Sequence, residues 1–122
     1  MKILIVEDHL DVLDCLRMYF SEKGHDVAAV ATAEEAILRL NRFCPDLAIV
    51  DMLLPKGHGR QVLQEIHKRG LPTRLVVVTG SDDLELKKEA KSLGASDYLF
   101  KPLTIHELDA LFSASSPAES SA

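Results

Sequence analysis

The chain alternates between short, almost wholly apolar runs and longer segments in which apolar side chains recur at helical spacing. Five of the runs have the length of β-strands, at residues 2–6, 26–30, 46–51, 74–79 and 97–100. After the first run, Leu13, Leu16 and Phe20 lie on one face of a predicted helix, and the later segments show the same pattern. Such an alternation predicts an α/β fold, in which five helices cover both faces of a five-stranded parallel sheet.

Capping signals mark several of the predicted helix ends. A Thr or Asp followed three residues later by Glu is typical of the first turn of a helix. Such pairs occur at Thr32 with Glu35, Asp82 with Glu85, and Thr104 with Glu107. Gly24 lies where the first helix should end, and glycine favours the left-handed backbone found at helix C-termini. We therefore expect helices to begin just after residues 32, 82 and 104.

The composition indicates one globular domain followed by a polar tail. The 122 residues are 47% apolar and 27% charged. No apolar run approaches the ~20 residues that span a bilayer, and the N-terminal segment becomes acidic too soon for a signal peptide, so we expect a cytoplasmic protein. Half of residues 113–122 are serine, which predicts a domain over residues 1–112 and a disordered tail or linker start over residues 113–122.

Charge and cysteine content exclude some functions. The formal net charge of -5 argues against direct nucleic-acid binding by this domain, because such binding needs a basic face. Cys15 and Cys44 are too few and too far apart for a zinc or redox motif, and we expect them in the core or on a helix face. A protein partner fits this surface better.

Polar residues stand at the ends of four of the apolar runs. Glu7 and Asp8 follow the first run, Asp51 ends the third, Thr79 ends the fourth, and Lys101 follows the fifth. Ligands of open α/β sheets bind beyond the carboxyl ends of the strands, so these side chains should meet in one crevice. The alternative is that the acid pair and Thr79 cap helices and the lysine belongs to a turn. Capping does not account for Asp51, which has apolar residues on both sides.

The chemistry of this set indicates phosphoryl transfer. Three carboxylates in one crevice repel one another unless a cation joins them. Oxygen ligands select a hard cation, and Mg²⁺ takes one or two carboxylates while keeping positions open for phosphate oxygens. Thr79 and Lys101 supply the donors that a transferred phosphoryl group needs. The residues therefore predict a magnesium-dependent site with Asp51 as the phosphoryl acceptor.

Over residues 1–112, these motifs together resemble the response-regulator receiver domain of two-component signalling. The matching segments are "VED" at 6–8, "DMLLPKGHG" at 51–59, "VVVTG" at 76–80 and "GASDYLFKP" at 94–102. The resemblance implies a doubly wound, flavodoxin-like sheet of strand order 2-1-3-4-5. It also implies that Asp51 is phosphorylated, that Asp8 binds Mg²⁺ directly and Glu7 mainly through water, and that the carbonyl of Leu53 is a further metal ligand.

The resemblance further implies a switch and a partner. Thr79 would hydrogen-bond the phosphoryl group and Lys101 would pair with it, while Tyr98 would swing inward as Thr79 moves. The alternative for Tyr98 is a plain core aromatic. The phosphoryl donor would be a phosphohistidine of a sensor histidine kinase or of a phosphotransfer protein. The domain is then a signalling module rather than an enzyme, and it catalyses only its own phosphorylation and dephosphorylation.

The sequence leaves the output open. The tail fits an output domain beyond residue 122, a phosphorylation-dependent dimer, or a stand-alone phosphorelay intermediate or interaction module. Receivers of winged-helix transcription factors use basic residues of the fifth helix in a dimer face. This chain has no Lys or Arg after Lys101, which disfavours that subclass.

Three rival classes fit less well. A haloacid-dehalogenase-type phosphotransferase needs a second acid two residues after the first, where this chain has Leu53. A flavin-binding flavodoxin needs a Ser/Thr/Gly-rich phosphate loop, where this chain has the repelling segment "EDHLD". A pseudo-receiver that acts only in docking would lack one of the acids or the lysine, and this chain has them all.

A few residues depart from the pattern or set its details. Gly80 replaces the usual alanine, and His58 stands where aspartate is frequent; we expect His58 to face solvent rather than to sense pH. His9 either approaches the metal or faces solvent on the first helical turn, and we expect the second. Leu53 and Ser81 occupy positions that tune phosphate loss, and apolar Leu53 cannot orient an attacking water. We therefore expect a long-lived phosphoryl state.

Overall fold

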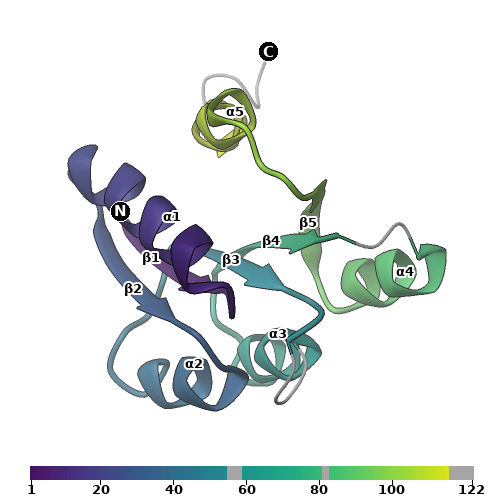
Figure 1. Ribbon diagram of the computed structural model, residues 1–122. Coiled ribbons are helices and arrows are strands. Elements are labelled where there is room, and N and C mark those ends of the chain that lie inside the picture. Colours follow the sequence, from purple (N-terminus) through teal and green to yellow (C-terminus); the bar gives the residue numbers. More distant parts are fainter. Residues whose placement is uncertain (55–58, 81–82, 116–122) are drawn as a thin grey trace.

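The computed structural model describes residues 1–54, 59–80 and 83–115, with side chains described as far as residue 112. The elements alternate strictly between strand and helix along the chain (Figure 1). Their order is β1 (Lys2–Val6), α1 (Leu10–Glu22), β2 (Asp26–Val30), α2 (Ala33–Arg39), β3 (Leu47–Asp51), α3 (Gly59–Lys68), β4 (Arg74–Thr79), α4 (Leu84–Ser92), β5 (Ala95–Phe100) and α5 (Ile105–Ser115). His58 and Ser81, for which the sequence analysis states expectations, lie outside the described residues.

The strands form one parallel sheet in the order β2-β1-β3-β4-β5, as the resemblance implied. Val6 at the end of β1 pairs with Val50 of β3, so Glu7 and Asp51 follow from neighbouring strands at the same height. Asp51 pairs in turn with Val78 of β4, and Thr79 with Phe100 of β5. The register therefore brings the four predicted strand ends to one edge of the sheet.

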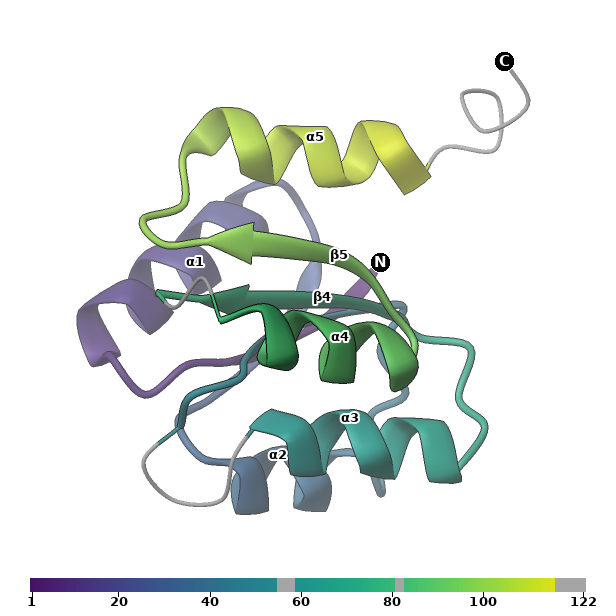
Figure 2. The same ribbon diagram turned by 90° about the vertical axis from the view of Figure 1, so that its right-hand side faces the viewer.

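Alternate residues of each strand point to opposite faces, which divides the core in two. Leu4, Val6, Val50 and Val77 belong to the cluster beneath α2, α3 and α4. The other cluster lies beneath α1 and α5, and its strand residues include Ile3, Ile5, Ile49 and Val78. Figure 2 shows the two helical layers on either side of the sheet. This three-layer arrangement explains why the strands are apolar throughout rather than in alternation.

The predicted helix ends are largely confirmed. Thr32 Oγ1 accepts the N–H of Glu35, and Gly24 has φ +88° after α1. Thr104 and Glu107 form a reciprocal pair, each backbone N–H donating to the other's side chain. The predicted start of α4 was wrong by one residue: Asp83, rather than Asp82, is the N-cap, because its carboxylate accepts the N–H of Glu85 at 2.9 Å. Asp82 lies outside the described residues.

Polar contacts attach the last helix to the sheet and to α1. Arg74 donates to the Asp97 carboxylate at 2.6 Å and to the carbonyl of Leu111 in α5. The Phe112 ring stacks on His25, with ring centroids 4.8 Å apart. Helix α5 runs to Ser115, three residues past the domain end expected at 112. Among the described helices, none has both the length and the hydrophobicity to cross a bilayer.

Both cysteines are exposed, so neither Cys15 nor Cys44 is a core residue. Cys15 lies on a helix face, on α1, which was one of the two expected placements. Cys44 lies between α2 and β3, on neither a helix nor a strand, so the expected core or helix-face placement was wrong for it.

Candidate functional site

The candidate site lies beyond the carboxyl ends of β1 and β3, where the chain's crossovers leave the sheet in opposite directions. Glu7 is 3% exposed, Asp51 5% and Thr79 0%. A buried carboxylate is unfavourable unless a cation or hydrogen bonds compensate its charge. The apolar strands behind these residues therefore hold two acids in a place that demands partners.

Lys101 is the partner of both acids. Its Nζ lies 2.5 Å from Glu7 Oε1 and 2.8 Å from Asp51 Oδ2. Burial lowers the pKa of Lys101, but the hydrogen bonds and charges of Asp51 and Glu7 outweigh that effect and hold the pKa above its usual 10.5. The N–H of Lys101 also donates to the carbonyl of Thr79 at 2.9 Å, which fixes the lysine beside the end of β4.

Both oxygens of the Asp51 carboxylate have partners. Oδ2 pairs with Lys101, and Oδ1 accepts the N–H of Leu53 at 2.9 Å. The start of α3 can lie this close to the end of β3 because residue 59 is glycine. A Cβ at residue 59 would lie 2.1 Å from the backbone oxygen of Asp51. The side chain of Leu53 is 42% exposed, so its place in the loop does not depend on burial. The Asp51 carboxylate is thus held by the backbone of Leu53 and by Lys101.

Asp8 and His9 flank this pair at the surface. Asp8 is half-buried, and its carboxylate and a ring nitrogen of His9 lie within 4.8 Å of each other and of a Glu7 oxygen. His9 is the N-cap of α1, and its N–H donates to Glu7 Oε2 at 2.9 Å. The His9 side chain is 75% exposed, as expected for a residue that faces solvent, but its ring also lies near both carboxylates, so an approach to the metal stays open.

The donor set fits a hard divalent cation. Glu7 and Asp8 lie close together beside His9, and Asp51 shares the Lys101 ammonium with Glu7, so three carboxylates surround one positive charge. Oxygen donors with surplus negative charge are what Mg²⁺ prefers. The carbonyl of Leu53 belongs to the same residue whose N–H donates to the Asp51 carboxylate. These residues fit the magnesium that the sequence led us to expect.

Tyr98 lies apart from the carboxylates. It is half-buried in β5 opposite Val77, packs against the α2–α4 side of the core, and meets the Phe100 ring edge-on at 5.5 Å. The switch role assigned to it stays a prediction, and its present environment is that of a partly buried aromatic.

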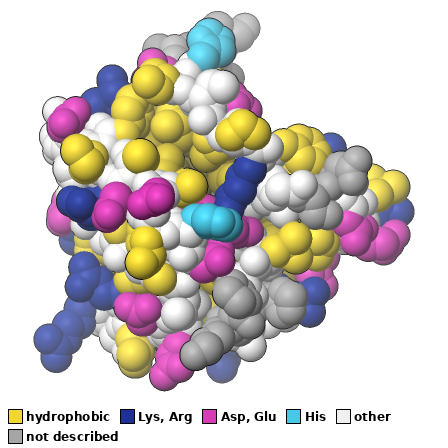
Figure 3. Space-filling model, in the orientation of Figure 1, with side chains coloured by type: hydrophobic (Ala, Val, Ile, Leu, Met, Phe, Trp, Pro, Cys, Tyr) yellow, Lys and Arg dark blue, Asp and Glu magenta, His cyan; other side chains and the backbone are white. Residues whose placement is uncertain are grey.

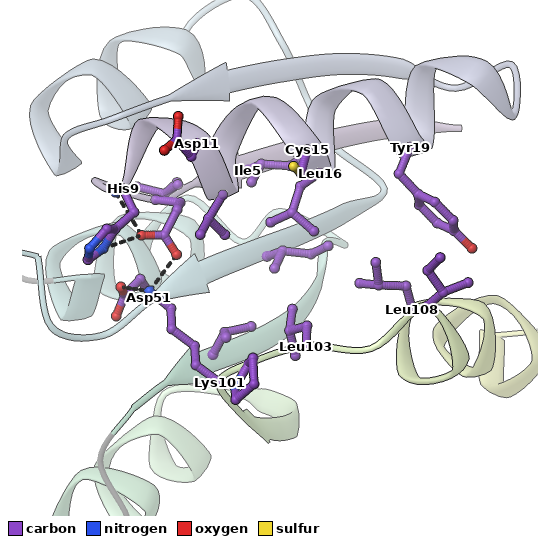
Figure 4. Close-up of a pocket in the computed structure, with 17 residues that line it drawn as sticks. Ile5, His9, Asp11, Cys15, Leu16, Tyr19, Asp51, Lys101, Leu103 and Leu108 are labelled. Atoms are coloured by element: carbon purple, nitrogen blue, oxygen red, sulfur yellow. Dashed lines mark hydrogen bonds and ion pairs between the residues drawn. The ribbon is translucent and has the colours of Figure 1, made fainter.

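A cavity of about 700 Å³ extends from the carboxylates between α1 and the segment that follows β5. Glu7, Asp51 and Lys101 form its polar end, and apolar side chains such as Ile5 and Leu108 line the rest (Figure 4). Figure 3 shows acidic and basic side chains meeting near the middle of this face, with hydrophobic side chains above them. The sequence analysis did not predict this cavity or the contact between Lys101 and Glu7. The contact could have been expected, because three acids at the strand ends share one lysine.

The topology and the strand-end acids define a doubly wound α/β domain with an acidic site, and comparison with known proteins gives the family. The model of the response regulator receiver domain matches residues 3–113. The chain therefore belongs to that family and is a receiver domain of a two-component response regulator, a signalling module.

Several relatives support this membership. The two-component response regulator PhoP of Pseudomonas aeruginosa is 35% identical over 114 residues, which cover 93% of this chain and 51% of that protein. The transcriptional regulatory protein CiaR of Streptococcus pneumoniae is 36% identical over 107 residues, or 88% of this chain and 47% of that protein. The chain thus spans about half the length of these curated relatives.

A solved receiver domain of the same fold is similar along nearly its whole length. The CheY-like response regulator receiver domain protein of Methanospirillum hungatei superposes with a TM-score of 0.89 at 28% identity. The match covers 98% of this chain and 96% of that one. The arrangement of the sheet and helices is therefore shared across the domain.

Proposed function

We propose that Asp51 is the phosphoryl acceptor of this receiver and takes the group from a phosphohistidine of a sensor histidine kinase or of a phosphotransfer protein. The observation that carries the proposal is the burial of the Asp51 carboxylate together with its two partners. It is buried at a strand end, yet Leu53 N–H and Lys101 Nζ hold it in place at the mouth of the site. Such a fixed carboxylate is positioned for nucleophilic attack.

In the proposed step, an Asp51 oxygen attacks the phosphorus in line as the bond from phosphorus to the donor imidazole breaks. The electron pair of that bond leaves with the imidazole, and the product is an acyl phosphate that water later hydrolyses. Lys101, already paired with Asp51, neutralises charge on the phosphoryl oxygens, and the Thr79 hydroxyl hydrogen-bonds one of them. The domain's own aspartate is consumed in each transfer, which makes the chain a signalling component rather than a classical enzyme.

Magnesium supplies charge neutralisation for this transfer when bound. Asp8 and Asp51 would hold it directly and Glu7 mainly through water. The Leu53 carbonyl would be the remaining protein ligand. The release of Glu7 Oε1 from Lys101 would leave the lysine to the phosphoryl group. The chain's contribution is therefore to position the acceptor and to exchange one set of charge pairs for another.

The signal would leave through Thr79 and Tyr98. Movement of the Thr79 hydroxyl toward the phosphoryl group would open space beside β5 into which Tyr98 turns, and the changed face would act on a partner protein or on an output domain. The half-length match to response regulators favours an attached output domain over a stand-alone module. A kinase donor that draws on ATP places this chemistry in the cytoplasm.

The lifetime of the phosphoryl group is expected to be long. Leu53 is apolar and lies next to the acceptor, where it cannot orient a water for attack on the acyl phosphate. Decay of phospho-Asp51 followed by intact mass would measure this, and complete loss within seconds would contradict it.

The decisive experiment is phosphorylation of the purified chain by acetyl phosphate or phosphoramidate, read by intact mass with and without Mg²⁺. We expect one phosphoryl group per chain in Mg²⁺ and none for Asp51→Asn. Asp46→Asn is the matched control, because Asp46 is an exposed carboxylate directly before the same strand. Modification that persists in Asp51→Asn, or that is indifferent to Mg²⁺, would overturn the proposal. Beryllofluoride with Mg²⁺ should likewise shift the NMR signals of Thr79 and Tyr98 in the wild type only.

A further inference from the structure

His9 occupies a place that neither the capping of α1 nor the proposed phosphotransfer explains. Its backbone caps the helix, but its side chain makes no capping hydrogen bond within the described residues. The imidazole is exposed, and in Figure 4 it lies at the Asp51 end of the cavity rather than along the helix. The exposed ring thus lies beside the Glu7 and Asp8 carboxylates, where a ring nitrogen can bind a ligand.

The distances suit ligation of a shared ion better than a direct contact. His9 Nδ1 lies 3.9 Å from Glu7 Oε2, too far for a hydrogen bond. Two donors that each bind one cation at about 2.1 Å lie at most about 4.2 Å apart, so His9 Nδ1 is close enough to Glu7 to reach an ion that Glu7 holds directly or through one water. The Asp8 carboxylate lies within 4.8 Å of both, and the His9 ring is 75% exposed.

The two oxygens of Glu7 are divided between different partners. Oε1 pairs with Lys101 at 2.5 Å, whereas Oε2 faces His9 and accepts its N–H. A cation on the Oε2 side is therefore separated from the lysine charge and is approached by Asp8 and His9.

From this arrangement we propose that His9 donates an imidazole nitrogen to the divalent-cation site and gives it a mixed nitrogen and oxygen donor set. The inference rests on the proposed function, since it concerns the same cation. Imidazole suits Co²⁺, Ni²⁺ and Zn²⁺, whereas Mg²⁺ prefers oxygen. The receiver then binds late first-row divalent metals more tightly than an all-oxygen site does, and such metals compete with Mg²⁺ beside Asp51.

The test is direct metal binding rather than phosphorylation. Untagged protein carrying Cys15→Ser and Cys44→Ser, which removes the exposed thiols, is titrated with CoCl₂ and with MgCl₂ by calorimetry, and the visible spectrum of bound Co²⁺ is recorded. We expect His9→Ala to weaken Co²⁺ binding by about tenfold or more and Mg²⁺ binding by less than about twofold. His67→Ala, which removes an exposed histidine of α3, should change neither.

A second variant separates ligation from helix capping. His9→Asn restores a good N-cap but offers no imidazole, so it should fold well and still lose the Co²⁺ preference. Equal Co²⁺ affinity in the parent, His9→Ala and His9→Asn proteins would overturn the inference, as would an equal loss in His67→Ala.

The proposed function can fail separately from this inference. If Mg²⁺ binding is indifferent to Asp8→Asn and to Asp51→Asn, the carboxylates do not form the metal site and both proposals fall. If Mg²⁺ binding needs these carboxylates while Co²⁺ binding ignores His9, only the role of His9 is wrong.

Discussion

Strands β3 and β5 carry the two sides of the same site, yet the protein holds them very differently. All residues of β3 are buried, and the strand pairs with a neighbour on each side. Strand β5 is the sheet edge, and its residues are only half-buried or exposed. Asp51, the proposed acceptor, ends the first of these strands, whereas Tyr98 belongs to the second and Lys101 follows it. The difference separates a rigid acceptor from elements that can rearrange at low free-energy cost.

The contacts of the last elements support this contrast. Asp109 of α5 pairs with Tyr19 and, at 3.7 Å, with Lys23, both on the α1 side of the molecule. These exposed polar contacts are individually weak compared with the continuous burial of β3. If Asp51 takes a phosphoryl group as proposed, we expect β5 and α5 to shift while β3 keeps its place.

The largest effect should come from the loop that closes on β3. Gly59→Ala would place a Cβ 2.1 Å from the Asp51 backbone oxygen, and backbone must move to relieve the clash. We expect the free energy of unfolding to fall by more than about 3 kcal/mol, measured by urea denaturation. Gly80→Ala is the control, because its Cβ would meet no described atom within 4 Å. A Gly59→Ala protein as stable as the control would contradict the rigid attachment of the acceptor.

The comparison can be tested directly with one truncation in each strand. Ile49→Ala in β3 removes a side chain that is 2% exposed, and we expect it to lower the free energy of unfolding by about 3–4 kcal/mol. Leu99→Ala in β5 removes a half-buried side chain from the same cluster and should lower it by about 1–2 kcal/mol. Equal losses in chemical denaturation would show that the two strands are held alike.

Removal of Lys101 should leave the negative charges of the buried acids uncompensated. Lys101→Met leaves Glu7 and Asp51 without their shared cation, and we expect it to destabilise the fold by about 2 kcal/mol at pH 7. Added Mg²⁺ should recover part of this loss. Lys87→Met, on the exposed part of α4, serves as the control and should change stability little. No loss in Lys101→Met would mean that the acids are compensated in another way.

The same lysine gives an alkaline pH dependence. Because the pKa of Lys101 is raised above 10.5 in the folded state, its contribution is complete below that pH and is lost as the pH rises through the folded-state pKa. Thermal unfolding of the wild type above pH 10.5 should therefore show a decline that Lys101→Met lacks.

The smallest expected effect concerns the end of α5. Burial, the charge of the N-terminal ammonium and the charge of Lys23 lower the pKa of His25 below 6.5. Neutral His25 thus stabilises the fold above pH 6.5, and this contribution, under about 1 kcal/mol because the ring is largely solvated, is lost as the pH falls through the folded-state pKa. His25→Phe keeps a ring on Phe112 but should flatten the acidic slope of the melting temperature, whereas His67→Gln should leave the slope unchanged.

The sequence predicted the parts of the molecule that depend on local pattern and strand direction. Apolar runs that end in acids were enough to place Glu7, Asp51 and Thr79 at one edge, since all strands of a parallel sheet present the same end. The bond from Lys101 to Glu7 depends on a long side chain choosing between nearby acids, which spacing does not show. The cavity depends on how α5 lies against α1, and periodicity gives the buried face of a helix but not its tilt.

Helix α5 contacts the rest of the protein more closely at its C-terminal end than at its first residue. Its last turns are fixed by Arg74 at Leu111 and by the ring stack at Phe112, while Ile105 in its first turn is 65% exposed beside the cavity. Any pivoting about the fixed end moves Ile105 through a wide arc and Phe112 hardly at all. The width of the cavity next to Asp51 therefore depends on the angle at which α5 leaves its contacts with Arg74 and His25.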